Sequence, residues 1–344
     1  MELLLIGLSR FARRRVLPAA ASMPGITAVD IASRHATAAD VAGVPKLRTL
    51  HGDWHGALEA RAPGLAYVSS VNSEHTAAVR HALERGWHVV VDKPGLPSVP
   101  GRPDVPGVPG LGVAAELVEL ARSASLVLAE AVCYAFHPMF SVVRELAAEA
   151  AQAVAVFTPP VPADDFRHDR ARGGGALLDT GPYLASLGRV LWGREPEQVG
   201  VMVGDRTADG LELSYSALAR YPGGRTVVGH FGFTGTYRNA LQLLGRHGVV
   251  DVERPFSMPP GLETEVTVRS DRGERVRRVP PADSMRLFLT RVVEAARTGS
   301  REFDEPVLSD ARTLDRLIRA AGAHPFGHPA TAPDTDCPKV DDNP

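Results

Sequence analysis

The 344-residue sequence has few of the residues that mark disulfide scaffolds, fibrous proteins or nucleic-acid binders. It contains two cysteines, Cys133 in an apolar segment and Cys337 in a polar one, so one chain cannot build a disulfide framework or a cysteine metal site. Aromatic residues make up 6%, and 38 Lys and Arg against 40 Asp and Glu leave a net charge of −2. A chain this close to neutrality lacks a general attraction for phosphate backbones or anionic lipids, so we expect neither nucleic acid nor a membrane as partner.

Long apolar segments are also missing. No run approaches the roughly 20 apolar residues of a membrane-spanning helix. The short apolar start at 1–8 precedes a group of arginines, which reverses the order of a secretory signal, and we expect a cytoplasmic protein. The histidines at 324 and 328 have no convincing acidic partner, so we expect no bound metal. The chain length exceeds the usual size of one hydrophobic core, which favours two domains.

The first part of the chain alternates short apolar runs with segments of helical period, the pattern of parallel strands joined by crossover helices. After residue 130 most segments alternate with period two between short turns, which is typical of an antiparallel sheet. The predicted fold is therefore an α/β Rossmann domain, 1–130, followed by an α+β domain, 131–322, with a large, mostly antiparallel open sheet. We expect a loop at 95–112 and a disordered tail at 323–344.

Individual elements follow from the same patterns. Five parallel strands are predicted in the first domain, at 3–7, 26–32, 65–69, 87–91 and 126–130. Seven antiparallel strands are predicted in the second domain, at 198–203, 211–221, 226–233, 237–244, 249–253, 265–268 and 275–279. Its predicted helices lie at 139–151, 176–191, 285–298 and 310–320.

The turn at 7–12, Gly-Leu-Ser-Arg-Phe-Ala, lies between the first strand and a helix, where a dinucleotide-binding fingerprint occurs. Gly7 would form the turn, Ala12 would let helix and strand pack closely, and the helix start with Arg10 and Phe11 would face the pyrophosphate. Ser9 replaces the usual middle glycine, and its hydroxyl is expected to donate to phosphate. Such a turn also occurs without a nucleotide, and Arg10 would then be a solvated arginine.

The second strand ends at Ser33 and Arg34, where enzymes for the unphosphorylated cofactor place a carboxylate against the ribose 2′-hydroxyl. A hydroxyl and a guanidinium bind phosphate, so this tip favours NADP(H) over NAD(H). In the alternative, the strand ends two residues earlier and Asp30 is the ribose acid.

Three segments resemble motifs of the glucose-fructose oxidoreductase, inositol dehydrogenase and rhizopine-catabolism (Gfo/Idh/MocA) family. The segment 68–94 resembles Asn-x-x-His followed by Gly-Lys-His-Val-x-x-Glu-Lys-Pro, with Trp87 and Asp92 in place of the first Lys and the Glu. The segment 136–138 resembles the end of Arg-Phe-His-Pro, with Ala135 in place of Arg. The segment 173–183 is similar to Gly-Gly-Gly-x-x-x-Asp-x-Gly-x-His, with Tyr183 in place of His. The resemblance assigns to the cofactor site Asn72, His75, Lys93 and Pro94.

Tyr183 resembles the branch of dihydrodiol dehydrogenases and sugar 3-ketoreductases, in which a tyrosine is the acid/base. The resemblance implies that Lys93 and Tyr183 form the catalytic pair, with Lys93 polarising a carbonyl and lowering the pKa of the phenol. Asp179 lies four residues before Tyr183, so it shares a helical face and would bind a substrate hydroxyl or orient Lys93. His137 and Arg167 are further candidate substrate ligands, or else a domain-boundary histidine and a solvated arginine.

The predicted activity is NADPH-dependent reduction of a ketone on a sugar, with a nucleotide-linked deoxysugar as the favoured substrate. One alternative is an NAD(P)-dependent dehydrogenase that oxidises a sugar, polyol or dihydrodiol. Another is a dinucleotide-binding regulatory protein without turnover, against which the joint presence of Lys93, Asp179 and Tyr183 argues. The antiparallel sheet has enough strands to leave one face open, so we expect a homo-oligomer formed through it.

Overall fold

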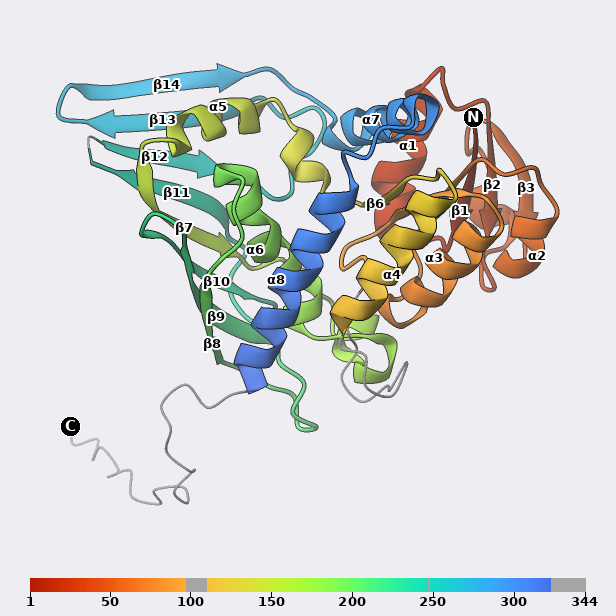
Figure 1. Cartoon of the computed structure of the whole chain (residues 1–344), viewed down its shortest axis with the longest axis horizontal. Helices are drawn as coiled ribbons and strands as arrows, with labels where there is room; N and C mark the ends of the chain where they lie inside the picture. The colour runs from red at the N-terminus through yellow and green to blue at the C-terminus, as the bar shows by residue number, and fades with distance from the viewer. Residues whose placement is uncertain (97–109, 247, 323–344) are drawn as a thin grey trace, which may run out of the picture.

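The computed structural model describes residues 1–96, 110–246 and 248–322. The predicted tail and most of the predicted loop at 95–112 therefore lie outside the described residues. Two sheets organise the chain, with the six-stranded sheet on the right of Figure 1 and the eight-stranded sheet on the left. The predicted fold class, a Rossmann domain followed by a domain with a large antiparallel sheet, is confirmed.

The first sheet is parallel throughout and has the strand order β3-β2-β1-β4-β5-β6. Its strands are β1 (Glu2–Ile6), β2 (Ala28–Ala32), β3 (Leu47–His51), β4 (Leu65–Val68), β5 (His88–Val91) and β6 (Leu128–Glu130). The order reverses at β1, which pairs with both β2 and β4, so the ligand crevice of such a fold is expected at the carboxyl end of β1.

The prediction of five strands was wrong by one, because it omitted the edge strand β3. None of the five residues of β3 is fully buried, and Arg48 and His51 interrupt its apolar character. An edge strand of this kind carries no continuous apolar run, which was the signal used for the other strands.

The helices around this sheet are short. They are η1 (Ala12–Val16), continued by α1 (Leu17–Ser22), then η2 (Ala38–Val41), α2 (Trp54–Glu59), η3 (Asn72–Glu74), α3 (His75–Glu84) and α4 (Gly110–Ser123).

The second sheet has the order β14-β13-β12-β11-β7-β10-β9-β8, and only its β7–β10 pair is parallel. All seven predicted strands are present. They are β8 (Gln198–Val203), β9 (Ser214–Tyr221), β10 (Arg225–Gly232), β11 (Asn239–Gly245), β12 (Gly248–Glu253), β13 (Thr264–Ser270) and β14 (Gly273–Val279).

The eighth strand, β7 (Ala150–Phe157), is central to the sheet and was missed. The helix predicted at 139–151 ends at Ala147 in α5 (Met139–Ala147). The segment after it is rich in alanine, a strong helix former, which explains the error. Hydrogen bonding to β11 and β10 on both edges outweighs that local preference.

Helices cover one face of the second sheet and reach back to the first (Figure 1). The helices of this part of the chain are η4 (Cys133–Phe136), α5, η5 (Phe166–His168), η6 (Arg170–Arg172), α6 (Ala176–Trp192), α7 (Ser284–Thr298) and α8 (Asp304–Gly322), of which α5, α6 and α8 pack on the second sheet. Helix α8 begins six residues before its predicted start at 310. It lies between the domains, with Val307 in an apolar cluster of the first sheet and Leu314 and Leu317 in the core of the second.

Helix α7 belongs to the core of the first sheet, although it lies near the end of the chain. Its residues Met285, Phe288 and Val292 are buried with Leu3 and Leu5 of β1. A boundary at residue 130 thus separates the strands of the two sheets, but the core of the first sheet also includes residues from beyond that boundary.

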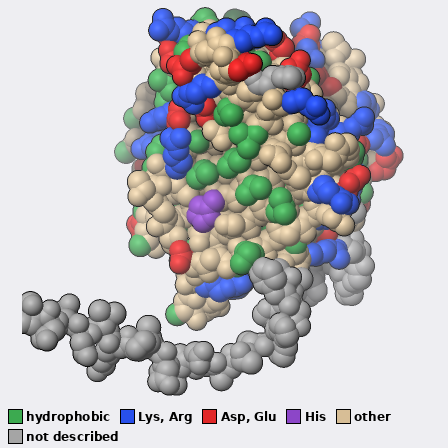
Figure 2. Space-filling model, turned by 90° about the vertical axis from the view of Figure 1, so that its left-hand side faces the viewer, with side chains coloured by type: hydrophobic (Ala, Val, Ile, Leu, Met, Phe, Trp, Pro, Cys, Tyr) green, Lys and Arg blue, Asp and Glu red, His purple; other side chains and the backbone are tan. Residues whose placement is uncertain are grey.

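The outer face of the second sheet is open. Figure 2 shows this face, with apolar side chains scattered over an uncharged centre and charged groups concentrated near the rim. Strand register places Leu218 beside Val228 and Met202 beside Ser216, and about half of each large apolar side chain is exposed. Among the helices of the described segments, none is both long and apolar enough to cross a membrane.

Candidate active site

A cleft of about 550 Å³ opens between the two domains, at the carboxyl end of the parallel sheet. It contains side chains from both domains, among them residues of the turn at 7–12 and the predicted catalytic residues, whereas Ser33 and Arg34 do not line it. The predicted site residues that line it are Ser9, Arg10, Phe11, Asn72, Lys93, Arg167, Asp179 and Tyr183.

Lys93 and Asp179 form an ion pair that joins the domains across the cleft. Lys93 follows β5 in the chain. Its Nζ atom donates to Asp179 Oδ1 at 2.8 Å and to the Asp179 backbone carbonyl at 2.5 Å. Arg167 Nε donates to the same Oδ1 at 2.9 Å. Burial acts in the opposite direction, but the charges of Lys93 and Arg167 hold the pKa of Asp179 well below its usual value. The carboxylate is therefore ionised and orients both cations.

Tyr183 lies one turn beyond Asp179 on α6, inside a group of aromatic rings. Its ring centroid is 4.8 Å from that of Phe157 and 5.3 Å from that of Phe256. Within the described chain its hydroxyl has no hydrogen-bond partner and is left for a ligand. Lys93 Nζ lies 5.1 Å from the ring centroid, over the ring and next to the carboxylate.

The lowering of the Tyr183 pKa that was predicted from Lys93 does not prevail in the structure, where the pKa of Tyr183 is raised. Burial and the nearby Asp179 carboxylate raise the pKa of Tyr183 well above its usual value of 10.0. The charge of Lys93 is directed at Asp179, so it does not offset this loss of solvation. In this structure the phenol is protonated at neutral pH.

A glycine triplet places α6 against the first domain. The Nδ2 atom of Asn72 donates to the Gly173 carbonyl at 2.8 Å, and a Cβ on Gly173 would lie 2.8 Å from Cβ of Asn72. A Cβ on Gly174 would meet the Arg167 carbonyl, and Gly175 has φ +109. Each glycine is therefore required by close packing or by backbone conformation.

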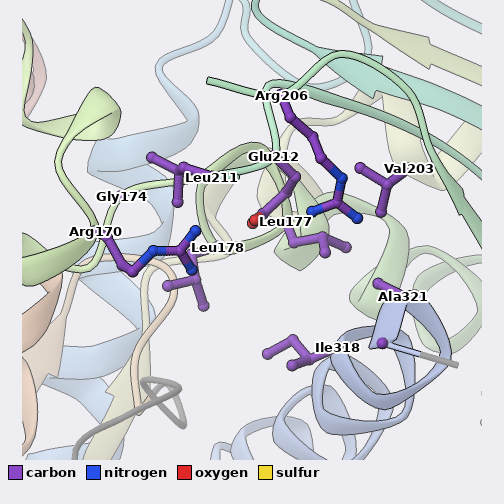
Figure 3. Close-up of a pocket in the computed structure, with 11 residues that line it drawn as sticks. Arg170, Gly174, Leu177, Leu178, Val203, Arg206, Leu211, Glu212, Ile318 and Ala321 are labelled. Carbon is purple, nitrogen blue, oxygen red and sulfur yellow. The ribbon is translucent and has the colours of Figure 1, made fainter. Parts of the chain in front are cut away.

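The far side of this turn faces a second, smaller cavity of about 190 Å³ (Figure 3). The backbone N–H of Ala176, the first residue of α6, donates to the backbone carbonyl of Glu212 at 2.9 Å. Figure 3 shows Arg170 and Arg206 reaching into this cavity on either side of the Glu212 carboxylate. A Cβ on Gly175 would collide with that carboxylate, so the glycine lets Glu212 approach the helix start. This cavity shares no lining residue with the cleft.

The turn at 7–12 has the geometry predicted for it. Gly7 has φ +86, and a Cβ there would lie 2.6 Å from the Ser69 carbonyl, so only glycine fits. Ala12 is fully buried between helix and strand. Arg10 and Phe11 line the cleft beside the turn. The turn, the strand order and the cleft together fit a dinucleotide.

The predicted donation from Ser9 to phosphate was wrong, because its hydroxyl belongs to an internal chain of hydrogen bonds. Ser69 donates to Asp92 Oδ2 at 2.5 Å, so the 2.7 Å contact between Ser9 and Ser69 requires Ser9 to donate. Ser9 also accepts from the Ala12 N–H at 2.9 Å. Tyr67 donates to the other oxygen of Asp92 at 2.5 Å. Two of the departures from the usual motifs, Ser9 and Asp92, are thus joined through Ser69.

His75 and Pro94 support the site from behind, since neither lines the cleft. The ring of His75 is buried, with Nδ1 2.9 Å from the Pro94 carbonyl and Nε2 3.1 Å from the Ser70 carbonyl. Burial lowers the pKa of His75, so the ring is neutral and donates to one carbonyl at a time. Through these contacts His75 positions the segment that follows Lys93.

The tip of β2 is not an acidic site. The strand runs to Ala32, and the Asp30 carboxylate is buried and accepts from Arg48 at 2.5 Å. The alternative in which Asp30 meets the ribose is therefore wrong. Ser33 and Arg34 follow the strand, and the exposed Arg34 side chain donates to Glu74 at 2.5 Å.

His137 is not among the residues that line the cleft. It is 1% exposed, and its Nδ1 accepts from the Met139 N–H at 3.2 Å, at the start of α5. A substrate contact for His137 has no support from this geometry. Arg167 does line the cleft, held by Asp165 at 2.9 Å as well as by Asp179.

Sequence reasoning missed several lining residues. Phe157 comes from the missed strand β7, Phe256 follows β12, and Pro159, Pro160 and Pro162 follow β7. The cluster of prolines directly after an apolar run was a readable signal, because it ends a strand at the carboxyl edge of the sheet. No group of three or more His, Cys, Asp or Glu side chains in the described chain could hold a metal ion.

Comparison with known proteins identifies the family. The model described as "Oxidoreductase family, NAD-binding Rossmann fold" matches residues 1–101, and that of the "GFO/IDH/MocA C-terminal domain" matches 149–251. The chain belongs to the Gfo/Idh/MocA oxidoreductase family. The resemblance inferred from the motifs is confirmed, and the chain is an oxidoreductase with an NAD(P)-binding Rossmann domain.

Three members of the Gfo/Idh/MocA family illustrate the likeness. A dTDP-3,4-didehydro-2,6-dideoxy-alpha-D-glucose 3-reductase from Streptomyces violaceoruber is 30% identical, over 92% of this chain and 94% of that protein. Human trans-1,2-dihydrobenzene-1,2-diol dehydrogenase is 29% identical, over 74% of this chain and 75% of that one. A crystallised variant of a 3-ketoreductase from Actinomadura kijaniata, in complex with TDP-benzene and NADP, superposes with a TM-score of 0.83 at 25% identity, covering 93% and 97% of the two chains.

The hydrogen bonds that link Ser9, Ser69 and Asp92 predict that Ser69→Ala weakens cofactor binding. The change disconnects Ser9 from Asp92 and removes the contact under the cofactor turn, so we expect roughly 10-fold weaker binding, the scale of one or two lost hydrogen bonds. Fluorescence titration with NADPH and with NADH measures it. Tyr67→Phe is the control, because it removes the other bond to Asp92 and leaves the two serines joined. Unchanged affinity in Ser69→Ala would show that the chain does not position the turn.

Proposed function

We propose that this protein catalyses the NADPH-dependent reduction of a ketone on a sugar, with a nucleotide-linked deoxysugar as substrate. The observation that carries the proposal is the arrangement of Lys93, Asp179 and Tyr183 in one cleft beside the cofactor turn. The likeness to dTDP-sugar 3-reductases supports the substrate class.

Lys93 has the geometry to bind a carbonyl oxygen. An ammonium has three N–H donors, and two of them donate to the Asp179 carbonyl and carboxylate. The third is left for the ketone, where its charge would stabilise the oxyanion that forms during reduction. Asp179 orients Lys93, as one of the sequence-based hypotheses proposed.

Tyr183 supplies the proton in this proposal. Its raised pKa keeps the phenol protonated at neutral pH, which is the state that a proton donor requires. The hydride is the chemistry that the bound nicotinamide supplies. In the oxidation suggested by the likeness to dihydrodiol dehydrogenase, the same group at Tyr183 would have to act as the base.

The cofactor preference is proposed to be for NADP(H). The exclusion of Asp30 from the tip of β2 leaves Ser33 and Arg34 as the groups nearest a 2′-substituent. Gly7, Arg10 and Phe11 would hold the pyrophosphate end at the turn.

The catalytic pair predicts two matched losses of activity. Lys93→Met and Tyr183→Phe should each lower kcat by roughly 100-fold or more, the scale of general acid catalysis. The losses should be non-additive in the double variant, because the two groups act on one oxygen. Steady-state kinetics on a nucleotide-linked ketosugar measure this, with NADPH affinity as the control. Near-native turnover of Tyr183→Phe would refute the role of the phenol.

Cofactor selectivity predicts opposite effects at Arg34 and Glu74. Arg34→Ala should weaken the binding of NADPH by about 10-fold and leave the binding of NADH unchanged, because it removes a charge-assisted bond to the 2′-phosphate. Glu74→Gln should strengthen the binding of NADPH, since it frees Arg34 from its ion pair and removes a negative charge beside the phosphate. Titration of both cofactors decides the matter, and tighter binding of NADH by the unaltered protein would contradict the assignment.

We also propose that the protein forms a homo-oligomer through the open face of the second sheet. The support is the exposed row of Met202, Leu218 and Val228 on β8, β9 and β10, with few charges around it (Figure 2). Leu218→Glu should convert the assembly to monomers in multi-angle light scattering. The control is Val276→Glu, on the charged strand β14 of the same face. A clean monomer at micromolar concentration before any substitution would contradict the proposal.

A further inference from the structure

Five cationic side chains line the active cleft, and three of them already have partners. Lys93 and Arg167 donate to Asp179. Arg15 donates to the Met258 carbonyl at 2.8 Å and also lies 3.5 Å from the carboxylate of residue 283. These three are committed to holding the protein together.

The other two cations, Arg10 and Arg14, make no hydrogen bond or ion pair with any residue in the described ranges. They lie four residues apart at the start of the first helix, so both face the same side. Their neighbour Arg13 differs, because it points away from the cleft and donates to the carbonyl of Asp40 at 2.6 Å and to its carboxylate at 3.2 Å. The helix therefore presents two unpaired guanidinium groups to the cleft and one paired guanidinium to the surface.

The position of Arg14 relative to the catalytic pair follows from the contacts of its neighbours. Arg15 fixes the helix to the Met258 carbonyl, two residues beyond Phe256. Phe256 packs against the Tyr183 ring at 5.3 Å between centroids. A continuous wall thus runs from Tyr183 through Phe256 and Met258 to the first helix, and all of these residues line the same cleft. A ligand with its ketone at Tyr183 would extend along this wall toward Arg14.

We propose that Arg14 binds the diphosphate of a nucleotide-linked sugar and thereby selects this substrate class over free sugars. The inference rests on the proposed function, and it adds the group that recognises the nucleotide part of the substrate. A guanidinium forms paired, charge-assisted hydrogen bonds with phosphate oxygens. The net charge of the chain gives no general attraction for such an anion, so a local cation in the cleft has to supply it. Arg10 lies at the cofactor turn and stays assigned to the cofactor.

The test measures binding of thymidine diphosphate by isothermal titration calorimetry in the presence of saturating NADP⁺. Arg14→Ala should weaken binding by about 10-fold or more, the scale of a lost bond between charged groups, and Arg14→Lys should retain part of the affinity. Arg13→Ala is the matched control on the same helix and should bind within a factor of two of the unaltered protein. All variants should bind NADPH with unchanged affinity and unfold at the same temperature, because Arg13 and Arg14 are exposed.

Three results would overturn the inference. If Arg14→Ala binds thymidine diphosphate normally, Arg14 has no part in recognition, and the proposed reaction is unaffected. If Arg14→Ala loses affinity for NADPH instead, the residue belongs to the cofactor site. If the unaltered protein binds neither thymidine nor uridine diphosphate, the nucleotide-linked substrate class fails together with the inference, whereas reduction of free ketosugars stays open to direct assay.

Discussion

The ion pair between Lys93 and Asp179 is the constraint on which the site depends, because it joins the strand end of one domain to the helix of the other. Both groups are largely buried, and a buried charge that loses its partner is strongly destabilising. Arg167 adds a second cation to the same oxygen, so the carboxylate cannot turn away without unpairing two charges.

Much of the site could be predicted from the sequence because its residues stand at positions that topology brings together. Lys93 and Asn72 follow parallel strands, and the carboxyl ends of parallel strands meet at one edge. Asp179 and Tyr183 share one face of α6 by their spacing alone. The glycines at 173–175 could not be explained in this way. Each is required because Asn72, Arg167 or Glu212 approaches too closely for a Cβ atom, and no local pattern reveals such contacts.

What the sequence could not supply was competition between neighbours. The alanines of β7 favour a helix until two flanking strands offer hydrogen bonds. The single proton of Ser9 is available to phosphate until Ser69 turns its own proton toward Asp92. Lys93 would stabilise a phenolate if the carboxylate of Asp179 were not nearer. In each case the behaviour of a residue depended on a partner distant in sequence.

The place of α7 in the first core bears on how the chain acquires its structure during synthesis. Met285, Phe288 and Val292 fill the layer against β1, yet they leave the ribosome nearly 280 residues after that strand. The amino-terminal half therefore exposes an apolar face through most of translation, in contrast to domains that close as soon as they emerge. The core of the nucleotide-binding half is therefore completed by a helix that follows the whole second sheet in the chain.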